Sequence, residues 1–124
     1  MPGSGKSTLG FWIDSVARDL SLDIKVISLD DFYLPGKEMD IAIKANPWNV
    51  PRGFPGSHSI DLLNESLNNF LQTGLLSSPS FDKSLRDGKG DRAGWSYCNP
   101  KVLILEGWFV GCEPLSDLSE IDNL

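Results

Sequence analysis

Apolar residues near the start of the chain recur at steps of three and four, the spacing of one face of an α-helix. The members of this stripe are Leu9, Trp12, Ile13, Val16 and Leu20. We therefore expect a helix from Gly5 to about Ala17. A second stripe with the same spacing predicts a helix from Ile60 to about Thr73. Ser59 suits the N-cap of this second helix, and Gly74 suits its C-terminal cap.

Two short apolar runs end in carboxylates. The run from Ile24 to Leu29 is rich in β-branched residues and is followed directly by Asp30 and Asp31. The run from Lys101 to Trp108 holds consecutive apolar residues followed by Glu106. Both runs are typical of buried β-strands. Each predicted strand therefore delivers carboxylates at or near its C-terminal end.

The remaining stretches, 31–59 and 77–100, show little periodicity and are interrupted by proline and glycine, so we expect them to be irregular. The resulting order of loop, helix, strand, loop, helix, loop and strand predicts an α/β fold with parallel strands. In such sheets the carboxyl ends of the strands and the N-termini of the helices meet along one edge, where ligands bind. The glycine-rich N-terminal loop, the two aspartates and Glu106 should therefore converge there.

Composition narrows the class of protein. A chain of 124 residues with 40% hydrophobic content is typical of one globular domain. Its net charge of -6 argues against a general nucleic-acid or anionic-membrane surface. There is no apolar run long enough to cross a membrane. Cys98 and Cys112 fit the reduced thiols of an intracellular protein, and a single histidine, His58, argues against a zinc site.

The N-terminal stretch Gly3-Ser4-Gly5-Lys6-Ser7-Thr8 matches the end of a phosphate-binding loop, G-x-x-x-x-G-K-[ST]. Glycines let successive backbone N–H groups curl around phosphate oxygens, and the following helix N-terminus adds partial positive charge. Lys6 would reach the β- and γ-phosphates, and the Ser7 hydroxyl would be a magnesium ligand. The alternative is a flexible start to an ordinary helix.

The strand-end acids suit the chemistry of phosphoryl transfer. A carboxylate beside a phosphate loop can take a proton from an attacking hydroxyl or hold magnesium through water. If strand geometry continues, Asp30 and Asp31 cannot point the same way, so one should face the site while the other caps or pairs elsewhere. Which of them is the base stays open. Glu106 fits the acid that orients magnesium, and Gly107 would allow close backbone approach. The alternative for each is a polar turn after a strand.

Basic residues gather in the two stretches predicted to be irregular. They are Arg52, Lys83, Arg86, Lys89 and Arg92. A kinase needs positive charge over the transferring phosphoryl group and opposite an acidic substrate. The segment from Arg52 to Ser59 also holds His58, which makes it the candidate substrate loop. The alternative is ordinary solvated loop charge.

Five blocks, "GSGKST", "SLDDFYLP", "NPWNVPRGFPGSH", "FDKSLRDGKGDRA" and "LILEGWFVG", follow one another in an order that resembles the D-glycerate 3-kinases. These are phosphate-loop kinases similar in core to uridine kinase, pantothenate kinase and phosphoribulokinase. The resemblance extends from residue 2 to about residue 115. It implies a P-loop NTPase-type parallel sheet with flanking helices.

The resemblance also implies ATP-dependent phosphorylation of D-glycerate to 3-phosphoglycerate, with magnesium. It assigns phosphate and magnesium binding to Gly3, Ser4, Gly5, Lys6, Ser7 and Thr8. It places Asp30 on the acid that related kinases use as the base, with Asp31 as the alternative, and Glu106 on the metal-orienting acid. The Phe81-Asp82 pair is similar to a Tyr-Asp pair that flanks the acceptor. The substrate-binding candidates on the matching blocks are Arg52, His58, Asp82, Lys83 and Arg92.

The chain departs from the family pattern in three places. The family has a glycine before Met1 and a central strand before that, and it continues into further strands, a lid and an adenine pocket. Where relatives often read Thr-His-Asp, this chain has Ser57-His58-Ser59. We therefore expect residues 1–124 to be one partial kinase domain that lacks the first strand and the C-terminal strands.

Two alternatives to glycerate phosphorylation follow from these departures. One is a non-catalytic nucleotide-binding protein or an inactive fragment of the family. The other is a kinase for a different hydroxyl acceptor, such as a nucleoside. The expected partners are ATP and a small hydroxy acid, with no nucleic acid and no membrane. The expected location is the cytoplasm, or the plastid stroma if the source is a plant.

Overall fold

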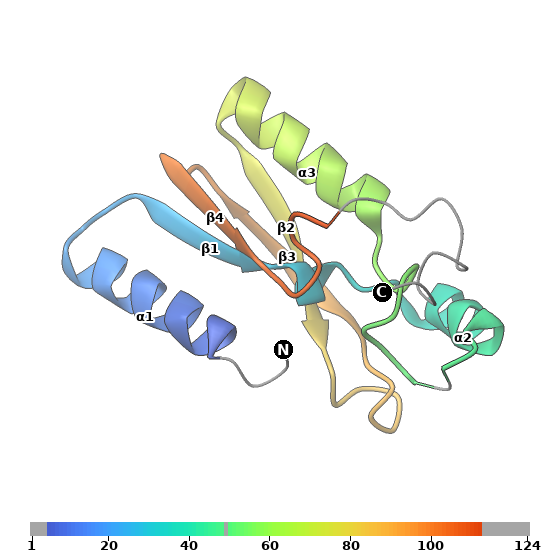
Figure 1. The fold of residues 1–124 in the computed structure, drawn as a ribbon. Helices are drawn as coiled ribbons and strands as arrows, with labels where there is room; N and C mark the ends of the chain where they lie inside the picture. Colours follow the sequence, from blue (N-terminus) through green and yellow to red (C-terminus); the bar gives the residue numbers. More distant parts are fainter. Residues whose placement is uncertain (1–4, 49, 113–124) are drawn as a thin grey trace.

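The computed structural model describes residues 5–48 and 50–112, and for Lys6 it describes the backbone alone (Figure 1). Its helices and strands follow one another in an α/β order. They are α1 (Lys6–Asp19), β1 (Ile24–Ser28), the 3-10 turn η1 (Leu29–Phe32), α2 (Gly36–Ala45), α3 (Ile60–Thr73), β2 (Leu76–Asp82), β3 (Asp91–Cys98) and β4 (Val102–Glu106). The predicted α/β class is confirmed.

Strands β1 and β4 pair in parallel, as predicted, with Ile24 opposite Val102 and Ser28 opposite Glu106. Successive side chains of β1 point to opposite faces of this pair. On one face Val26 meets α1, where a Cβ built on Gly10 would lie 3.2 Å from Val26 Cγ1. On the other face Ile27 joins the core beneath α3. Helices thus cover both faces of the parallel pair (Figure 1).

The main core joins the parallel pair to α3 and to the second sheet. Its buried members are Ile27, Leu29, Phe32, Leu63 and Leu76. Leu67 and Phe70 of α3, and Leu103 and Leu105 of β4, pack against these residues. Helix α3 has the predicted bounds, and Gly74 ends it in the left-handed conformation (φ 77°). Ser59 precedes the helix, but its side chain makes no capping hydrogen bond.

Helix α2 was not predicted, since residues 31–59 were expected to be irregular. The helix buries one large side chain, Met39, which is fully inaccessible and packs with Tyr33 and Phe54. Its neighbour Ile41 is 70% exposed. Ala42 and Ile43 also pack against this cluster, so α2 has a short i, i+3, i+4 set, but the helix spans only 10 residues between Pro35 and Pro47 and was too short to be distinguished from the irregular stretch around it.

The β2–β3 hairpin was also not predicted, because residues 77–100 were expected to be irregular. The two strands pair antiparallel, with Leu76 opposite Cys98 and a register shift at Ser80/Phe81. Strand β2 reads LSSPSFD, a composition with low β-propensity, and Pro79 lies inside it. Its contacts with η1 and α3 stabilise the strand, and these are tertiary interactions that local sequence does not encode.

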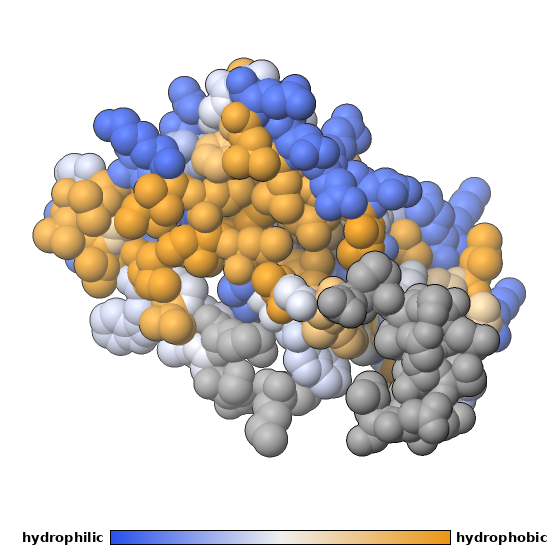
Figure 2. Space-filling view, turned by 45° about the horizontal axis from the view of Figure 1, so that its top comes forward, coloured by the Kyte–Doolittle hydropathy of each residue, from blue (hydrophilic) through white to orange (hydrophobic). Residues whose placement is uncertain are grey.

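The apolar stripe predicted for α1 is present, but it does not form the packing face. Leu9, Trp12 and Leu20 are more than 60% exposed, whereas Ala17 is buried. Small residues contact the sheet because they permit close approach, and this turns the large apolar side chains outward. Figure 2 shows a face of the molecule on which apolar residues form a broad continuous area. No described helix has the length and apolar character needed to cross a membrane.

Candidate active site

The carboxyl ends of β1 and β4 bring the predicted loop and acids to one place. Ser28 and Glu106 are register partners at the end of the parallel pair. The hydroxyl of Ser7, in the first turn of α1, donates to Glu106 Oε1 at 3.3 Å. An open cavity of about 390 Å³ has Ser7, Asp30, Asp31, Lys83 and Glu106 in its lining. The expected convergence at this sheet edge is thus seen for Ser7, the two aspartates and Glu106, whereas residues 1–4 of the predicted loop lie outside the described residues.

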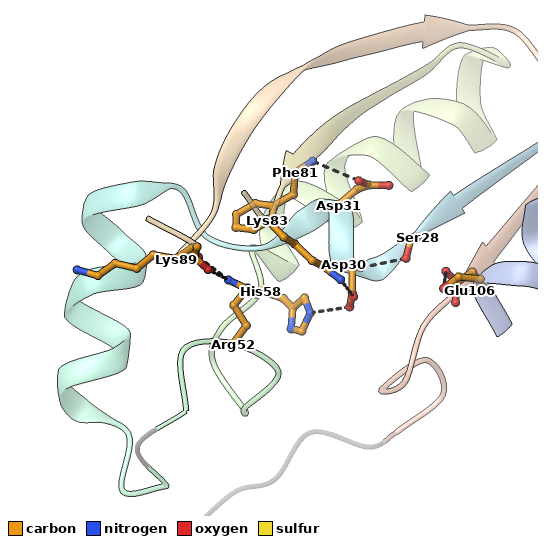
Figure 3. Close-up of polar contacts among 11 residues, drawn as sticks. Ser28, Asp30, Asp31, Arg52, His58, Phe81, Lys83, Lys89 and Glu106 are labelled. Carbon is orange, nitrogen blue, oxygen red and sulfur yellow. Dashed lines mark hydrogen bonds and ion pairs between the residues drawn. The ribbon is translucent and has the colours of Figure 1, made fainter. Parts of the chain in front are cut away.

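Asp30 lines this cavity, and Figure 3 shows it between Ser28, Lys83 and His58. After β1 the chain turns into η1, and the Ser28 hydroxyl accepts a hydrogen bond from Asp30 N. The Asp30 carboxylate receives a 2.8 Å hydrogen bond from Lys83 Nζ and lies 4.0 Å from His58 Nε2. His58, which offers a second N–H when protonated, and Lys83 hold the pKa of Asp30 well below its usual range, although partial burial opposes them. Asp30 is therefore ionised at neutral pH.

Asp31 has different surroundings. Its Oδ1 accepts a hydrogen bond from Phe81 N at 3.2 Å, which ties η1 to β2. Burial raises the pKa of Asp31, against the lowering effect of its backbone hydrogen bonds. The two aspartates have different partners, as expected, since Asp30 meets Lys83 and His58 while Asp31 accepts from the backbone of β2, but both of them line the cavity.

The candidate substrate loop reaches Asp30 through a short antiparallel bridge between Tyr33 and His58. Leu34 N donates to Ser57 O at 3.0 Å and Ser59 N donates to Phe32 O at 2.7 Å. The His58 ring then stacks on Tyr33 with 4.2 Å between ring centroids. Sequence reasoning missed Tyr33, whose signal is its position one helical turn after Asp30.

The basic side chains divide into one that lines the cavity and others that hold loops. Lys83 lines the cavity. Arg52 donates to the carbonyls of Gly88 and Lys89 at 2.7 and 2.8 Å, and so binds the substrate loop to the hairpin turn. Arg92 Nη2 lies 3.4 Å from Tyr33 O and from Ser59 Oγ. In this arrangement both arginines support the loops around Asp30.

Three further predicted residues take less central positions. Asp82 accepts hydrogen bonds from the backbone and hydroxyl of Ser84, within the turn after β2, whereas its neighbour Phe81 lines the cavity. Gly5 adopts the positive φ of 83° that glycine permits, and Thr8 is exposed on α1. Gly3 and Ser4, like the Lys6 side chain, lie outside the described residues.

The oxygen atoms of Ser7 and Glu106 suit magnesium. Mg²⁺ prefers oxygen ligands, keeps several waters and binds through one or two carboxylates together with substrate phosphates. Within residues 5–48 and 50–112, no three His, Cys, Asp or Glu side chains form a metal cluster. The donor set therefore fits a metal that arrives with a nucleotide better than one held in a protein cage.

Comparison with known proteins places this geometry in a group of kinases, although no family model matches the chain. The chain is 41% identical to the uncharacterized kinase mug58 of Schizosaccharomyces pombe, over 91% of its own length and 45% of the relative. It is 35% identical to the chloroplastic D-glycerate 3-kinase of Arabidopsis thaliana, over 91% of its length and 27% of the relative. The chain is a homologue of the D-glycerate 3-kinases.

Solved structures of a D-glycerate 3-kinase and of a related kinase also match this chain. The D-glycerate 3-kinase from Cryptococcus neoformans matches with a TM-score of 0.70 and 30% identity, over 89% of this chain and 41% of that one. Phosphoribulokinase from Rhodobacter spheroides matches with a TM-score of 0.58 and 16% identity, over 85% of this chain and 40% of that one, and supports the fold alone. The chain thus has a P-loop kinase fold and spans less than half the length of these relatives.

Proposed function

We propose that the protein is an ATP-dependent kinase that transfers a phosphoryl group to the 3-hydroxyl of D-glycerate. The observation that carries the proposal is the meeting of the Ser7 hydroxyl, Glu106 and the Lys83-bound Asp30 around one cavity. A phosphate-loop serine, a strand-end acid and a second acid near the acceptor are the parts that phosphoryl transfer uses. Homology to D-glycerate 3-kinases supports D-glycerate as the acceptor.

In this proposal each side chain has a separate task. The loop backbone and Lys6 bind the nucleotide phosphates, while Ser7 and Glu106 hold magnesium. The ion supplies neutralising charge on the phosphates when it is bound. Asp30 accepts the hydrogen of the attacking hydroxyl and orients its oxygen toward the phosphate. Because the pKa of Asp30 is lowered, the residue acts by orientation more than by basicity. Positioning of this kind is the main protein contribution to phosphoryl transfer.

The test is ADP formation by the purified protein with magnesium, ATP and D-glycerate, compared with uridine and with no acceptor. Asp30→Asn should lower turnover by about 100-fold or more while leaving ATP binding intact. Asp87→Asn is the matched control, since Asp87 is an exposed residue of the hairpin turn. Its turnover should equal that of the parent protein.

Three results would contradict the proposal or part of it. If uridine increased ADP release and D-glycerate did not, the acceptor would be a nucleoside. Full turnover in Asp30→Asn would mean either that Asp31 is the base or that the mechanism needs no base. ATP binding by calorimetry without turnover on any acceptor would favour the non-catalytic alternative.

A further inference from the structure

Strand β1 pairs with β4 alone among the described residues, so its other edge has no strand partner there. Asp23 O accepts hydrogen bonds from Lys101 N and Val102 N, at 2.9 and 3.0 Å, and therefore points toward β4. Because the backbone groups of successive residues in a strand point to alternate edges, those of Val26 and Ser28 point away from β4. An edge with unpaired N–H and C=O groups is a template for another strand.

The cavity of the candidate active site continues along this edge. Its lining includes residues 25–28 of β1, together with Phe11 and Asp14 of α1. Residues 25–27 precede the sheet end at which Ser28 lies opposite Glu106. The cavity thus has a catalytic end and an edge part that follows the β1 backbone, and the edge part is where another strand can enter.

Phe11 lies beside the edge part of the cavity, and the apolar stripe of α1 does not explain its exposure. Gly10 and Ala17 face the sheet. Since each helical residue is rotated by about 100° from the last, Phe11 lies on one side of these contacts, whereas Leu9 and Val16 lie on the other. Phe11 is 66% exposed. An exposed aromatic side chain beside an unpaired strand edge is typical of a protein–protein contact.

A second copy of the chain fits this edge by symmetry. Most homo-oligomers use two-fold contacts, in which one surface meets the same surface of its partner. When two β1 strands run antiparallel with Val26 opposite Val26, these residues exchange two N–H···O bonds, because their backbone groups point to the edge. Gly10 of α1 lies against Val26, so its neighbour Phe11 is also near the two-fold axis. The two Phe11 rings are then close enough to pack on each other.

The charges along the edge suit the same pairing. The Lys25 side chain shares a face of β1 with Ile27, and in the pair Lys25 of one copy lies opposite Ile27 of the other. Beyond Ile27 the cavity is lined by Asp30 and Asp31. Asp30 already pairs with Lys83, whereas Asp31 is bound by a backbone N–H. The ammonium group of each Lys25 is thus directed toward the acidic end of the other copy's cavity, and opposite charges of this kind fix the register of an interface.

We propose that the unpaired edge of β1 is a dimer interface, at which two copies of this chain pair antiparallel about Val26. The two parallel pairs then form one continuous sheet, to which each copy contributes β1 and β4. Each copy also brings Lys25 to the acidic end of its partner's cavity. The pairing is derived from backbone direction, exposure and charge, so its tests do not depend on phosphoryl transfer.

The first experiment detects the contact itself by NMR. Lys25 and Ile27 of different copies form a non-hydrogen-bonded pair, in which the Hα atoms face each other. Within one chain the same residues are about 7 Å apart along the strand. A mixture of ¹³C-labelled and unlabelled protein should therefore show a filtered NOE between these Hα atoms. A monomer at the concentration of the NMR sample, or a dimer without this NOE, would overturn the proposal.

The second experiment measures the dimer dissociation constant by sedimentation. All proteins carry Trp12→Gln, which removes an exposed aromatic residue from another side of α1. Phe11→Gln should weaken the dimer by about 10-fold or more, because two aromatic contacts are lost. Lys25→Gln should weaken it by about 2- to 30-fold, because two ion pairs are lost. Lys44→Gln, at an exposed lysine of α2, is the matched control and should have no effect.

Lys25→Gln also separates the proposal from the opposite role for this lysine. Lysines on edge strands often prevent pairing with other chains. In that role the loss of Lys25 would strengthen association, and such a result would overturn the proposal. Dissociation constants that are equal in Phe11→Gln, Lys25→Gln and the Lys44→Gln control would overturn it as well. Weakening by the first two variants alone is the result expected for a dimer joined at β1.

Discussion

Asp30 and Asp31 are adjacent in the chain and yet have opposite pKa shifts. His58 and Lys83 lower the pKa of Asp30, whereas burial raises that of Asp31. The sequence pattern predicted that the two would have different partners, but it could not say which would meet the basic side chains. That depends on Lys83 and His58, which come from distant parts of the chain. Tyr33 and Ser57 were missed for the same reason, since their roles exist only once the loops meet.

Lys83→Met should move the loss of activity at acidic pH to a higher pH. Removing the ammonium group takes away one cause of the lowered pKa of Asp30, so the carboxylate takes up a proton earlier as pH falls. Profiles of kcat/KM against pH would measure the shift toward the usual value of about 4. Lys89→Met, which removes an exposed lysine near Asp40, should leave the profile unchanged. Identical profiles for all three proteins would contradict the role given to Lys83.

Gly107→Ala should destabilise the protein by about 1–3 kcal/mol. A Cβ at this position would lie 2.4 Å from Leu29 Cβ, so the end of β4 or η1 must move. This confirms the prediction that Gly107 allows close backbone approach. Gly94→Ala is the control, because its nearest neighbour would be Ser80 Oγ at 3.6 Å. Urea denaturation of both variants would measure the difference, and equal midpoints would count against the packing argument.

At the scale of elements, sequence patterns predicted the helices and strands that bury a whole apolar face. They missed the helix and strands that are stabilised by contacts with residues distant in the chain. Helix α3 and strands β1 and β4 carry apolar runs or stripes, so periodicity revealed them. Helix α2 and the β2–β3 hairpin stabilise each other through polar contacts. Arg86 of the hairpin turn donates to Gly36 O and pairs with Asp40, and Asp91 accepts from Gly36 N. Partners so far apart in the chain leave no local signal.

Arg86→Met should therefore loosen α2 from the hairpin. The substitution removes a guanidinium that is 28% exposed and makes several charged contacts, at a cost of about 1–3 kcal/mol. Hydrogen exchange should accelerate first at the N-terminal turn of α2. Arg18→Met breaks an exposed pair with Asp14 and should cost less than about 0.5 kcal/mol. Uniform acceleration across the whole chain would instead indicate global unfolding.

At the scale of the whole molecule, the order of elements predicted the α/β class and the edge where the site lies. It did not predict that the large apolar residues of α1 would face outward. Periodicity shows that a helix has an apolar face, but it cannot show which side packs on the sheet. Here Gly10 and Ala17 determine which side of α1 packs on the sheet, because small residues allow the helix to approach β1.

The exposed apolar side of α1 should make the 124-residue chain associate as its concentration rises. Replacing Trp12, which is 62% exposed, with Gln should increase the monomer fraction in sedimentation velocity without lowering the unfolding midpoint. Ile41→Gln offers the matched control, since Ile41 is 70% exposed on α2, away from this side. Equal gains from both variants would show that the effect is general and is not specific to α1.

The parallel pairing of β1 with β4 has a consequence for the order of folding. Ile24 pairs with Val102, so α2, α3 and the hairpin are all made between the two partners. During synthesis β1 leaves the ribosome first and must wait for β4, while the hairpin and α3 can already form from neighbouring residues. Contacts between distant residues close late because the loop entropy must be overcome first. The sheet edge that unites Asp30 and Glu106 is thus among the last parts of the molecule to be assembled, so the site forms only when nearly all the described chain has been made.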